Sequence, residues 1–405
     1  MTAFNQALRE DLQSLREQGL FRHLRRVDSA QSPRVELDGF ALTNFSSNDY
    51  LGLANHPTVK QAAVEAVQKY GAGSGASRSI CGSLAPHHEL EEEIAAFKGT
   101  EGALVFSSGF AAAIGTIGAV VGPGDVIVID RLAHASIIDA ARLCGAKLRV
   151  FAHNDLDALE KILRWAVDRR NAKTERSRIL IATESVFSMD GDLAPLTEIV
   201  SLKDKYGAWL FLDEAHAAGL FGENRRGLAE AFGLADRVEI QFGTLGKAIG
   251  SAGGYVAGSR SLIDVLINRA RSFIFSTAPV PAASAAATAG IRLVRSAEGE
   301  QRRQQCWRVV DLIKNALVDL RWPASAVRSA IIPLIIGPET KAVEAAEALY
   351  GAGVYIPAIR YPTVARGSAR LRISASAAHR DNDVQLLTAA LSRLDVSHRQ
   401  EAVAS

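Results

Sequence analysis

Short apolar runs alternate with longer amphipathic segments through the middle of the chain. The apolar runs lie at 103–106, 126–129, 148–151, 179–183, 209–212, 240–242 and 255–257. Several are apolar on both faces, which is typical of strands that helices cover on both sides. Segments with helical spacing separate them, near 109–121, 134–143, 155–170, 195–206 and 260–270. This alternation predicts an α/β domain built on a mainly parallel sheet.

The two ends of the chain carry other patterns. Residues 4–26 have apolar positions at helical spacing, which predicts an amphipathic helix packed on the body or on a partner subunit. Residues 33–45 favour a hairpin that turns at Asp38-Gly39. After residue 285 the pattern predicts one long helix over 285–318, strands at 331–336, 354–358 and 370–374, and helices near 340–350 and 380–395.

These patterns predict a division of the chain into domains. We expect an N-terminal helix and hairpin segment (1–56), a large α/β domain (57–284), a smaller α+β domain (285–395) and a tail (396–405). A length of 405 residues favours two domains over one.

The composition excludes several classes of protein. Hydrophobic residues make up 48% and charged residues 22%, and a formal net charge of +2 argues against a nucleic-acid or membrane-surface binder. Cys81, Cys144 and Cys306 are widely spaced and odd in number, so they form no disulfide framework and fit a reducing compartment. Residues 1–26 lack the apolar core of a signal peptide. We therefore expect a cytoplasmic protein.

An acid and a lysine follow two of the predicted strands. Asp213 ends the run at 209–212, His216 comes one turn later, and Lys247 lies in Gly243-Thr244-Leu245-Gly246-Lys247. A buried acid at a strand end can keep a pyridine nitrogen protonated, and a lysine on a tight loop can hold pyridoxal phosphate covalently. On these two motifs alone, an ordinary strand end and a glycine-rich turn remain an equal alternative.

A third motif could bind a phosphate. Ser107-Ser108-Gly109-Phe110 follows a predicted strand and opens a helix rich in Ala and Gly. Backbone N–H groups at a helix start attract anions, and Gly109 permits a close approach, while Phe110 would serve through its N–H. A plain helix cap explains the same pattern.

Three more polar residues stand at the ends of predicted strands. His134 lies where open α/β sheets place ligands and could stack on a flat heterocycle, although a structural histidine is the alternative. Ser188 could donate a hydrogen bond to the phenolate oxygen of a pyridoxal ring, next to a simple turn signal at Asp190-Gly191. Arg360 precedes a proline turn and could bind a carboxylate through two parallel hydrogen bonds. An arginine side chain in solvent at a strand end is the alternative.

Other chemistries lack their motifs. The loop around Lys247 is too short between its glycines for a Walker loop, and no Ser or Thr follows the lysine. The sequence has no strand-linked G-x-G-x-x-G and no G-x-S-x-G, which disfavours a dehydrogenase and a serine hydrolase. A metal site at His216 is weakly supported, because no second histidine or cysteine pair has a matching spacing.

Together these motifs resemble the α-oxoamine synthase family. Its members are fold-type-I pyridoxal-phosphate enzymes that condense an amino acid with an acyl thioester and lose carbon dioxide. The resemblance covers residues 4–395 and is carried by Ser46-Ser47-Asn48-Asp49-Tyr50-Leu51-Gly52, Ser185-Val186-Phe187-Ser188-Met189-Asp190-Gly191-Asp192, Asp213-Glu214-Ala215-His216 and Thr244-Leu245-Gly246-Lys247. It implies a large domain on a mainly parallel sheet and a smaller α+β domain.

The resemblance also implies a role for each matched residue. Three would be catalytic: Lys247 carries pyridoxal 5'-phosphate and moves the α-proton, Asp213 pairs with the pyridine nitrogen, and His134 stacks on the ring. The other implied cofactor contacts are Gly109, Phe110, Ser188, His216 and Thr244, with Ser276 and Thr277 reaching the phosphate of the partner in a homodimer. The implied substrate contacts are Asn48, His134 and Arg360 at the amino acid and Arg22 and Thr363 at the acyl group.

Within the family, one segment indicates the substrate. Residues 358–364, with Gly367 and 370–373, are most similar to the member that joins L-alanine to a pimeloyl thioester, carried on CoA or acyl carrier protein, in biotin synthesis. Tyr361 departs from the proline usual at that place. A sister synthase that uses glycine or serine with another acyl-CoA is the nearest alternative. An NAD-linked dehydrogenase and a non-catalytic scaffold are the more distant ones.

Overall fold

The computed structural model describes residues 2–171, 177–324 and 326–394, whose contacts form two compact units. The large unit comprises residues 48–188 and 192–304, and the small unit comprises residues 2–47, 189–191 and 305–394. The domain boundaries expected at 57 and 285 remain predictions, because these units describe clusters of contacts and not separately folding segments. The expected tail, 396–405, lies outside the described residues.

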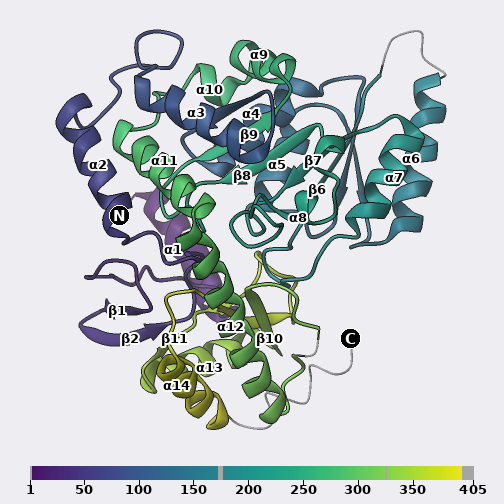
Figure 1. The fold of residues 1–405 in the computed structure, drawn as a ribbon. Coiled ribbons are helices and arrows are strands. Elements are labelled where there is room, and N and C mark those ends of the chain that lie inside the picture. Colours follow the sequence, from purple (N-terminus) through teal and green to yellow (C-terminus); the bar gives the residue numbers. More distant parts are fainter. Residues whose placement is uncertain (1, 172–176, 325, 395–405) are drawn as a thin grey trace. The chain divides into compact units, whose positions relative to one another are not determined.

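The large unit is built on a sheet in the order β3-β9-β8-β7-β6-β4-β5 (Figure 1). Its strands are β3 (Gly102–Phe106), β4 (Val126–Asp130), β5 (Lys147–Phe151), β6 (Ile179–Glu184), β7 (Trp209–Asp213), β8 (Ile240–Thr244) and β9 (Gly254–Gly258). The five strands β5, β4, β6, β7 and β8 are neighbours in this order, and each neighbouring pair is parallel. Strand β9 runs antiparallel to β3 and β8. The predicted mainly parallel sheet is confirmed.

Helices cover both faces of this sheet. They are α2 (Pro57–Tyr70), α3 (Ala85–Lys98), α4 (Gly109–Val120), α5 (Ala135–Leu143), α6 (Leu156–Asn171), α7 (Leu196–Tyr206), α8 (Leu228–Ala231), the 3-10 turn η1 (Ala235–Arg237), α9 (Arg260–Arg269), α10 (Arg271–Ile274) and α11 (Pro281–Arg295). Along β4, Ile127 and Ile129 belong to a core cluster with residues of α4 and α5, while Val126 and Val128 belong to one with residues of α6 and α7.

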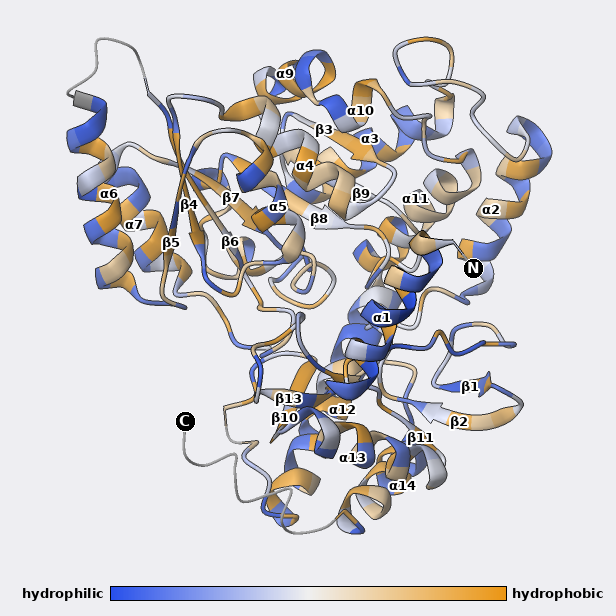
Figure 2. Ribbon diagram, turned by 180° about the vertical axis from the view of Figure 1, so that it is seen from behind, coloured by the Kyte–Doolittle hydropathy of each residue, from blue (hydrophilic) through white to orange (hydrophobic). Residues whose placement is uncertain are grey.

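The alternation along β4 explains why the strands are apolar at successive positions. Side chains of a strand point to opposite faces in turn, and each face here meets a helical layer. Figure 2 shows the hydrophobic colour concentrated on the central strands and on the inner sides of the helices. Each fully buried Val, Leu or Ile stabilises the fold by about 1.5–3 kcal/mol, so this double layer gives a rigid support to the loops that follow the strands.

The small unit contains two sheets, in the orders β1-β2-β11 and β10-β13-β12, among its described residues. The strands are β1 (Arg34–Leu37), β2 (Phe40–Asn44), β10 (Ile331–Gly337), β11 (Val354–Tyr355), β12 (Ala358–Ile359) and β13 (Ala369–Ser374), and the helices are α1 (Ala3–Glu17), α13 (Glu339–Gly351) and α14 (Asp381–Ser392). The predicted hairpin is confirmed, since Leu37 pairs with Phe40 and the turn residues Asp38 and Gly39 have φ of 51° and 83°.

Three predicted elements were wrong in extent. The helix expected over 4–26 ends at Glu17, because Gly19 adopts φ 65°. The helix expected over 285–318 is two helices, α11 and α12 (Ala297–Asp319), which are separated where Ser296 is extended and its hydroxyl accepts from Gly299 N–H. The strand expected over 354–358 is interrupted, giving β11 and β12.

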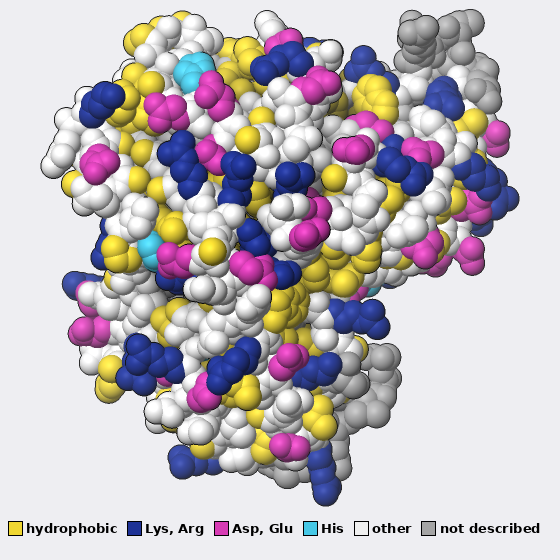
Figure 3. All heavy atoms as spheres, in the orientation of Figure 1, with side chains coloured by type: hydrophobic (Ala, Val, Ile, Leu, Met, Phe, Trp, Pro, Cys, Tyr) yellow, Lys and Arg dark blue, Asp and Glu magenta, His cyan; other side chains and the backbone are white. Residues whose placement is uncertain are grey.

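The surface mixes both signs of charge. Figure 3 shows lysine and arginine interspersed with aspartate and glutamate over the face in view. Helix α1 is amphipathic, yet it contains no buried residue, and Phe4, Leu8, Leu12 and Leu15 remain exposed. None of the helices in the described ranges is both long enough and apolar enough to cross a bilayer.

Candidate active site

The predicted cofactor residues of the large unit gather where its parallel strands end. In such sheets the carboxyl ends of the strands share one edge, and the loops there form the ligand site. Asp213 ends β7, and Thr244 ends β8. The loop after β8 is closed by hydrogen bonds from Leu245 N–H to Gly253 O (2.9 Å) and from Ser251 N–H to Leu245 O (2.9 Å). This tight loop holds Lys247.

A chain of hydrogen bonds leads from Lys247 into the interior. Nζ of Lys247 lies 2.7 Å from Nε2 of His216, and Nδ1 of His216 lies 2.6 Å from the hydroxyl of Tyr50. That hydroxyl lies 3.2 Å from Oδ1 of Asn48. Tyr50 and His216 are buried, so the partner on Nδ1 decides which nitrogen of the imidazole carries the proton. The structure thus joins Lys247, His216 and Asn48, which were predicted separately.

Tyr50 is a functional candidate that the motif analysis did not single out. It lies within the quoted segment Ser46-Ser47-Asn48-Asp49-Tyr50-Leu51-Gly52, but it shows neither helical nor strand periodicity there. Its contact with His216 spans 166 positions of the sequence, which no local pattern reports.

Asp213 is a buried acid, as its predicted role requires. Its carboxylate is 5% exposed and accepts a hydrogen bond of 2.8 Å from Ala215 N–H. Burial raises the pKa of Asp213 to about 6, against the opposing attraction of the Lys247 ammonium group. A cationic partner such as a pyridinium nitrogen would favour the charged form of this acid.

The neighbouring Glu214 is neutralised by a buried cation. Nζ of Lys98 lies 2.5 Å from Oε2 of Glu214, and both side chains are fully buried. The other oxygen of Glu214 accepts from Ala229 N–H at 2.9 Å. The charge of Glu214 raises the pKa of Asp213, although less than burial does. Lys98 thus pairs with the acid next to the predicted pyridine partner.

A second carboxyl lies beside Asp213 at the same sheet edge. Glu184 is the register partner of Asp213 on β6, and it is 2% exposed. Its Oε2 accepts from Ser188 N–H at 3.1 Å, while its Oε1 is buried without a hydrogen-bond partner among the described residues. Burial and then the charge of Asp213 raise the pKa of Glu184 well above its usual value. Glu184 thereby holds the backbone of one predicted cofactor residue, Ser188, a role that sequence reasoning missed.

His134 and Ser188 stand on loops that follow β4 and β6. His134 is the N-cap of α5, and its Nδ1 accepts from Ser136 N–H at 3.2 Å, so the exposed ring is held by its own helix. Ser188 is buried just after β6. Because β4, β6 and β7 are parallel neighbours, the loops that carry these residues start at the same sheet edge as Asp213.

The predicted phosphate residues are also brought together. Helix α4 begins at Gly109, capped by the Ser108 hydroxyl, which accepts from Ala111 N–H at 3.1 Å. A Cβ placed on Gly254 would lie 2.5 Å from the Cα of Gly109, so only glycine lets the helix start rest on β9. The Cβ position of Gly109 lies 3.9 Å from Oγ1 of Thr244. Phe110 follows within the first turn of α4, where backbone N–H groups have no intrahelical acceptor.

Ser276 and Thr277 lie on the segment after α10. Thr277 forms an isolated bridge with Ser77, and its side chain is exposed. Their predicted contact with a partner subunit remains a prediction.

Arg22, Arg360 and Thr363 belong to the small unit. Within it, Arg360 donates to the carbonyl oxygens of Gly19 and Phe21, Arg22 donates to Tyr361 O at 2.9 Å, and Thr363 N–H bonds to Arg360 O at 3.0 Å. Nε of Arg360 is buried without a hydrogen-bond partner among the described residues. Burial and the charge of Arg22 lower the pKa of Arg360. The structure therefore groups the three predicted substrate residues of this unit with one another.

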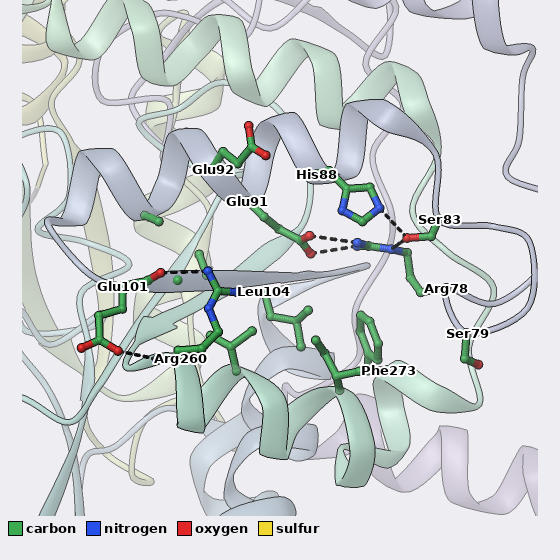
Figure 4. Close-up of a pocket in the computed structure, with 15 residues that line it drawn as sticks. Arg78, Ser79, Ser83, His88, Glu91, Glu92, Glu101, Leu104, Arg260 and Phe273 are labelled. Carbon is green, nitrogen blue, oxygen red and sulfur yellow. Dashed lines mark hydrogen bonds and ion pairs between the residues drawn. The ribbon is translucent and has the colours of Figure 1, made fainter.

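A cavity of about 550 Å³ lies elsewhere in the large unit, between α3, β3 and α9 (Figure 4). The most buried charged side chain in its lining is Arg78. The guanidinium group of Arg78 donates to both carboxylate oxygens of Glu91, at 2.8 and 2.9 Å. The lining, taken from the described residues, includes none of the predicted cofactor contacts. We therefore place the candidate site at the sheet edge and not in this cavity.

The residues at the sheet edge fit pyridoxal phosphate. The close approach of Gly254 to Gly109 puts the start of α4 against β9, where its N–H groups could bind a phosphate. Asp213 provides a buried anion for a ring nitrogen. Lys247 provides an amine that can react with an aldehyde. In the described part of the chain, no group of histidine, cysteine or acidic side chains could hold a metal ion.

Comparisons with known proteins show the family. The model of the family "Aminotransferase class I and II" matches residues 41–391. The chain is similar to 8-amino-7-oxononanoate synthase of Geobacter sulfurreducens, with 48% identity over 95% of this chain and 96% of that protein. A second such synthase, from Geotalea daltonii, is 46% identical over 96% of this chain and 98% of the relative.

Solved structures show the same fold. Serine palmitoyltransferase from S. paucimobilis, with a bound PLP–myriocin aldimine, superimposes with a TM-score of 0.89 and 29% identity, covering 97% of this chain and 98% of that one. An 8-amino-7-oxononanoate synthase from Francisella tularensis superimposes with a TM-score of 0.71 and 26% identity, covering 87% and 97%. The fold is therefore that of the fold-type-I pyridoxal-phosphate transferases, and this chain belongs to the aminotransferase class I and II family.

Proposed function

We propose that this protein is a pyridoxal-phosphate-dependent acyltransferase that condenses L-alanine with a pimeloyl thioester. The products would be 8-amino-7-oxononanoate, carbon dioxide and a free thiol, which is the reaction that the names of its similar relatives indicate. The observation that carries the proposal is the amine of Lys247 at 2.7 Å from His216, beside the buried acid Asp213. Lysine, acid and histidine at one sheet edge are the groups that this chemistry requires.

When bound, the cofactor supplies a sink for the electron pair left on the amino acid after its α-proton is removed. Asp213 would keep the proton on the ring nitrogen, since a carboxylate facing a pyridinium forms a charge-assisted hydrogen bond. Ser188 and His216 would hold the ring oxygen, and His134 would cover one face of the ring. Gly109, Phe110 and Thr244 would hold the phosphate, whose charge favours the helix start.

Lys247 has two tasks in this proposal. Its Nζ holds the cofactor between turnovers and, once released, takes the proton from the α-carbon and returns one to the product. A base near neutral pH needs an amine whose charge is disfavoured. Nζ of Lys247 lies 2.7 Å from the buried His216, which faces the buried Tyr50 on its other side.

The substrate contacts follow from charge. Asn48 and Arg360 would bind the carboxylate of alanine, and Arg22 and Thr363 would contact the acyl thioester. Bidentate binding suits the planar guanidinium group of Arg360. We further propose that the enzyme is a homodimer in which Ser276 and Thr277 reach the phosphate of the other subunit, with CoA or acyl carrier protein delivering the acyl group.

A substrate screen tests the proposal. Purified protein supplied with pyridoxal phosphate is mixed with pimeloyl-CoA and, separately, L-alanine, glycine or L-serine, and thiol release is measured. We expect release with L-alanine and little with the others. Release with glycine or serine alone would indicate a sister synthase, an outcome made relevant by the similarity to serine palmitoyltransferase. The Lys247→Ala variant is the control, and thiol release by it at the wild-type rate would contradict the proposed role of Lys247.

A further inference from the structure

A histidine outside the predicted site joins two of the loops that form it. His153 follows β5, and both of its ring nitrogens face carboxylates. Nδ1 lies 3.0 Å from Oδ1 of Asp130, at the end of β4, and Nε2 lies 2.8 Å from Oδ2 of Asp192, beyond β6. Carboxylates cannot donate, so an imidazole satisfies both contacts only when both nitrogens carry protons. The geometry therefore favours a cationic His153, because the carboxylate oxygen at 2.8 Å is closer to Nε2 than the amide nitrogen of Asn154 at 3.3 Å.

The neighbouring residue repeats the same two contacts. Asn154 adopts φ 55°, a left-handed conformation that asparagine tolerates, and its N–H donates to Oδ2 of Asp130 at 3.0 Å. Its side-chain amide donates to Oδ2 of Asp192 at 2.9 Å and to Leu193 O at 3.3 Å. His153 and Asn154 thus bind the same pair of acids, of which Asp130 is buried and Asp192 is half-buried.

Each acid belongs to a loop with a predicted cofactor residue. Asp130 also accepts from Leu132 N–H at 2.7 Å, which shapes the turn leading to His134. Asp192 accepts from Phe187 N–H through its carbonyl oxygen at 3.0 Å, which closes the loop around Ser188. The ring of Phe187 packs edge-on against His153, with centroids 4.4 Å apart. The histidine thus contacts both loops through ionic and apolar groups.

We propose that His153 is a positioning residue: together with Asn154 it ties the loop of His134 to the loop of Ser188, and so fixes the spacing of the two residues that would hold the cofactor ring. This inference rests on the proposed function for the roles of His134 and Ser188. Glu184 accepts from Ser188 N–H at 3.1 Å within the second loop, and His153 contacts the acids of both loops. His153 therefore joins two loops that Glu184 does not.

The charge of His153 agrees with this arrangement. Burial acts to lower the pKa of His153, but the hydrogen bonds that its ring donates to Asp130 and Asp192 raise this pKa to about 10. The imidazolium form is therefore present over the whole range in which the enzyme would work.

The test compares variants by cofactor affinity. His153→Phe keeps an aromatic ring against Phe187 but removes both donors, and His153→Gln keeps one amide donor. Fluorescence titration with pyridoxal phosphate should show a dissociation constant raised about tenfold or more for His153→Phe, and by less for His153→Gln. The circular dichroism of the bound cofactor, which reports the orientation of its ring, should weaken in the same order.

A double variant and a remote control make the test specific. Asp192→Ala should weaken cofactor binding, and the double variant with His153→Phe should lose less affinity than the sum of the two single losses, because both changes break the contact between His153 and Asp192. His56→Phe removes a histidine–glutamate contact of 3.1 Å and the N-cap of α2, so it should lower thermal stability without changing cofactor affinity.

Two results would overturn the proposal. One is a His153→Phe protein with wild-type affinity and wild-type dichroism. The other is a loss of affinity in His56→Phe equal to that in His153→Phe, because the effect would then follow from general destabilisation. If His153→Phe does not fold, His153→Gln and Asp192→Ala decide the question in the same way. Failure of the wild-type protein to bind pyridoxal phosphate would instead reject the proposed function and this inference with it.

Discussion

The hydroxyl of Tyr50 lies 2.6 Å from Nδ1 of His216. The Tyr50→Phe variant should reduce kcat about tenfold, since a lost buried hydrogen bond costs about 1–3 kcal/mol. The cause would be a change in the proton position on His216, which faces Lys247. KM for L-alanine should change less than kcat. Steady-state kinetics over a range of pH measure both constants.

Tyr255 offers a matched control for Tyr50. It is equally buried, but its hydroxyl has no hydrogen-bond partner among the described residues. Tyr255→Phe should therefore leave kcat near the wild-type value. Equal kinetics for the two phenylalanine variants would argue against a role for the Tyr50 hydroxyl.

Asp213 should destabilise the cofactor-free protein at neutral pH. Its pKa in the fold, about 6, lies above its usual value of 3.8, so the folded state binds the proton more tightly than the unfolded state does. The favourable contribution of the protonated acid is present below the unfolded pKa and is lost as pH rises through about 6. The Asp213→Asn variant without cofactor should therefore be more stable than wild type at about pH 8, by on the order of 2 kcal/mol, and should bind the cofactor more weakly.

Thermal unfolding of both cofactor-free proteins between about pH 4 and pH 8 measures this difference. The advantage of the asparagine variant should disappear at the acidic end. A difference independent of pH would mean that charge burial at Asp213 is not its cause.

The sequence could identify residues whose signal is local. Asp213, His216 and Lys247 lie directly after apolar runs or among glycines, and the fold brings them to one edge. Tyr50, Glu184 and Lys98 could not be identified in this way. Lys98 meets Glu214 across 116 positions, and Tyr50 meets His216 across 166. Such contacts form only in the tertiary fold, and the sequence around each of the two residues shows no pattern of apolar and polar positions that would indicate the contact.

At the scale of elements, the start of α4 depends on a glycine in β9. Gly254→Ala would place a Cβ 2.5 Å from Cα and 2.6 Å from N of Gly109, both backbone atoms that cannot move independently. We expect α4 to shift at its first turn, and the affinity for pyridoxal phosphate to fall about tenfold or more, since the helix start would bind the phosphate. Titration by fluorescence measures this loss.

Gly118 lies on the same helix and provides the control. A Cβ there meets open space, and alanine has a higher helix propensity by about 1 kcal/mol. Gly118→Ala should therefore stabilise the protein or leave it unchanged, with normal cofactor affinity. Weakened binding by both variants would mean that α4 responds to any substitution, and not to the contact with β9.

The extent of elements was predictable where turn residues mark their ends. The hairpin at Asp38-Gly39 and the strands of the large sheet appeared at the expected places. The predicted helices over 4–26 and 285–318 were too long, because a single glycine or serine can end a helix inside an unbroken periodic pattern. Gly19 and Ser296 have this effect through their backbone conformations.

At the scale of the molecule, alternating strands and helices were sufficient to predict the fold class. The order of strands in the sheet was not predictable, because pairing partners such as β3 and β9 are about 150 residues apart. No sequence pattern indicated that β9 would run antiparallel to its neighbours. The fold and the family are shared by enzymes with different substrates, so the identity of the reaction must be measured on this protein.

The most direct measurement follows the carboxyl carbon of alanine. Enzyme supplied with pyridoxal phosphate is incubated with pimeloyl-CoA and L-alanine labelled at its carboxyl carbon, and the product and the released gas are analysed by mass spectrometry. The account predicts labelled carbon dioxide, an unlabelled 8-amino-7-oxononanoate, and one thiol for each product molecule. A product that retains the label, or thiol release without any new carbon–carbon bond, would contradict decarboxylative condensation as the function of this protein.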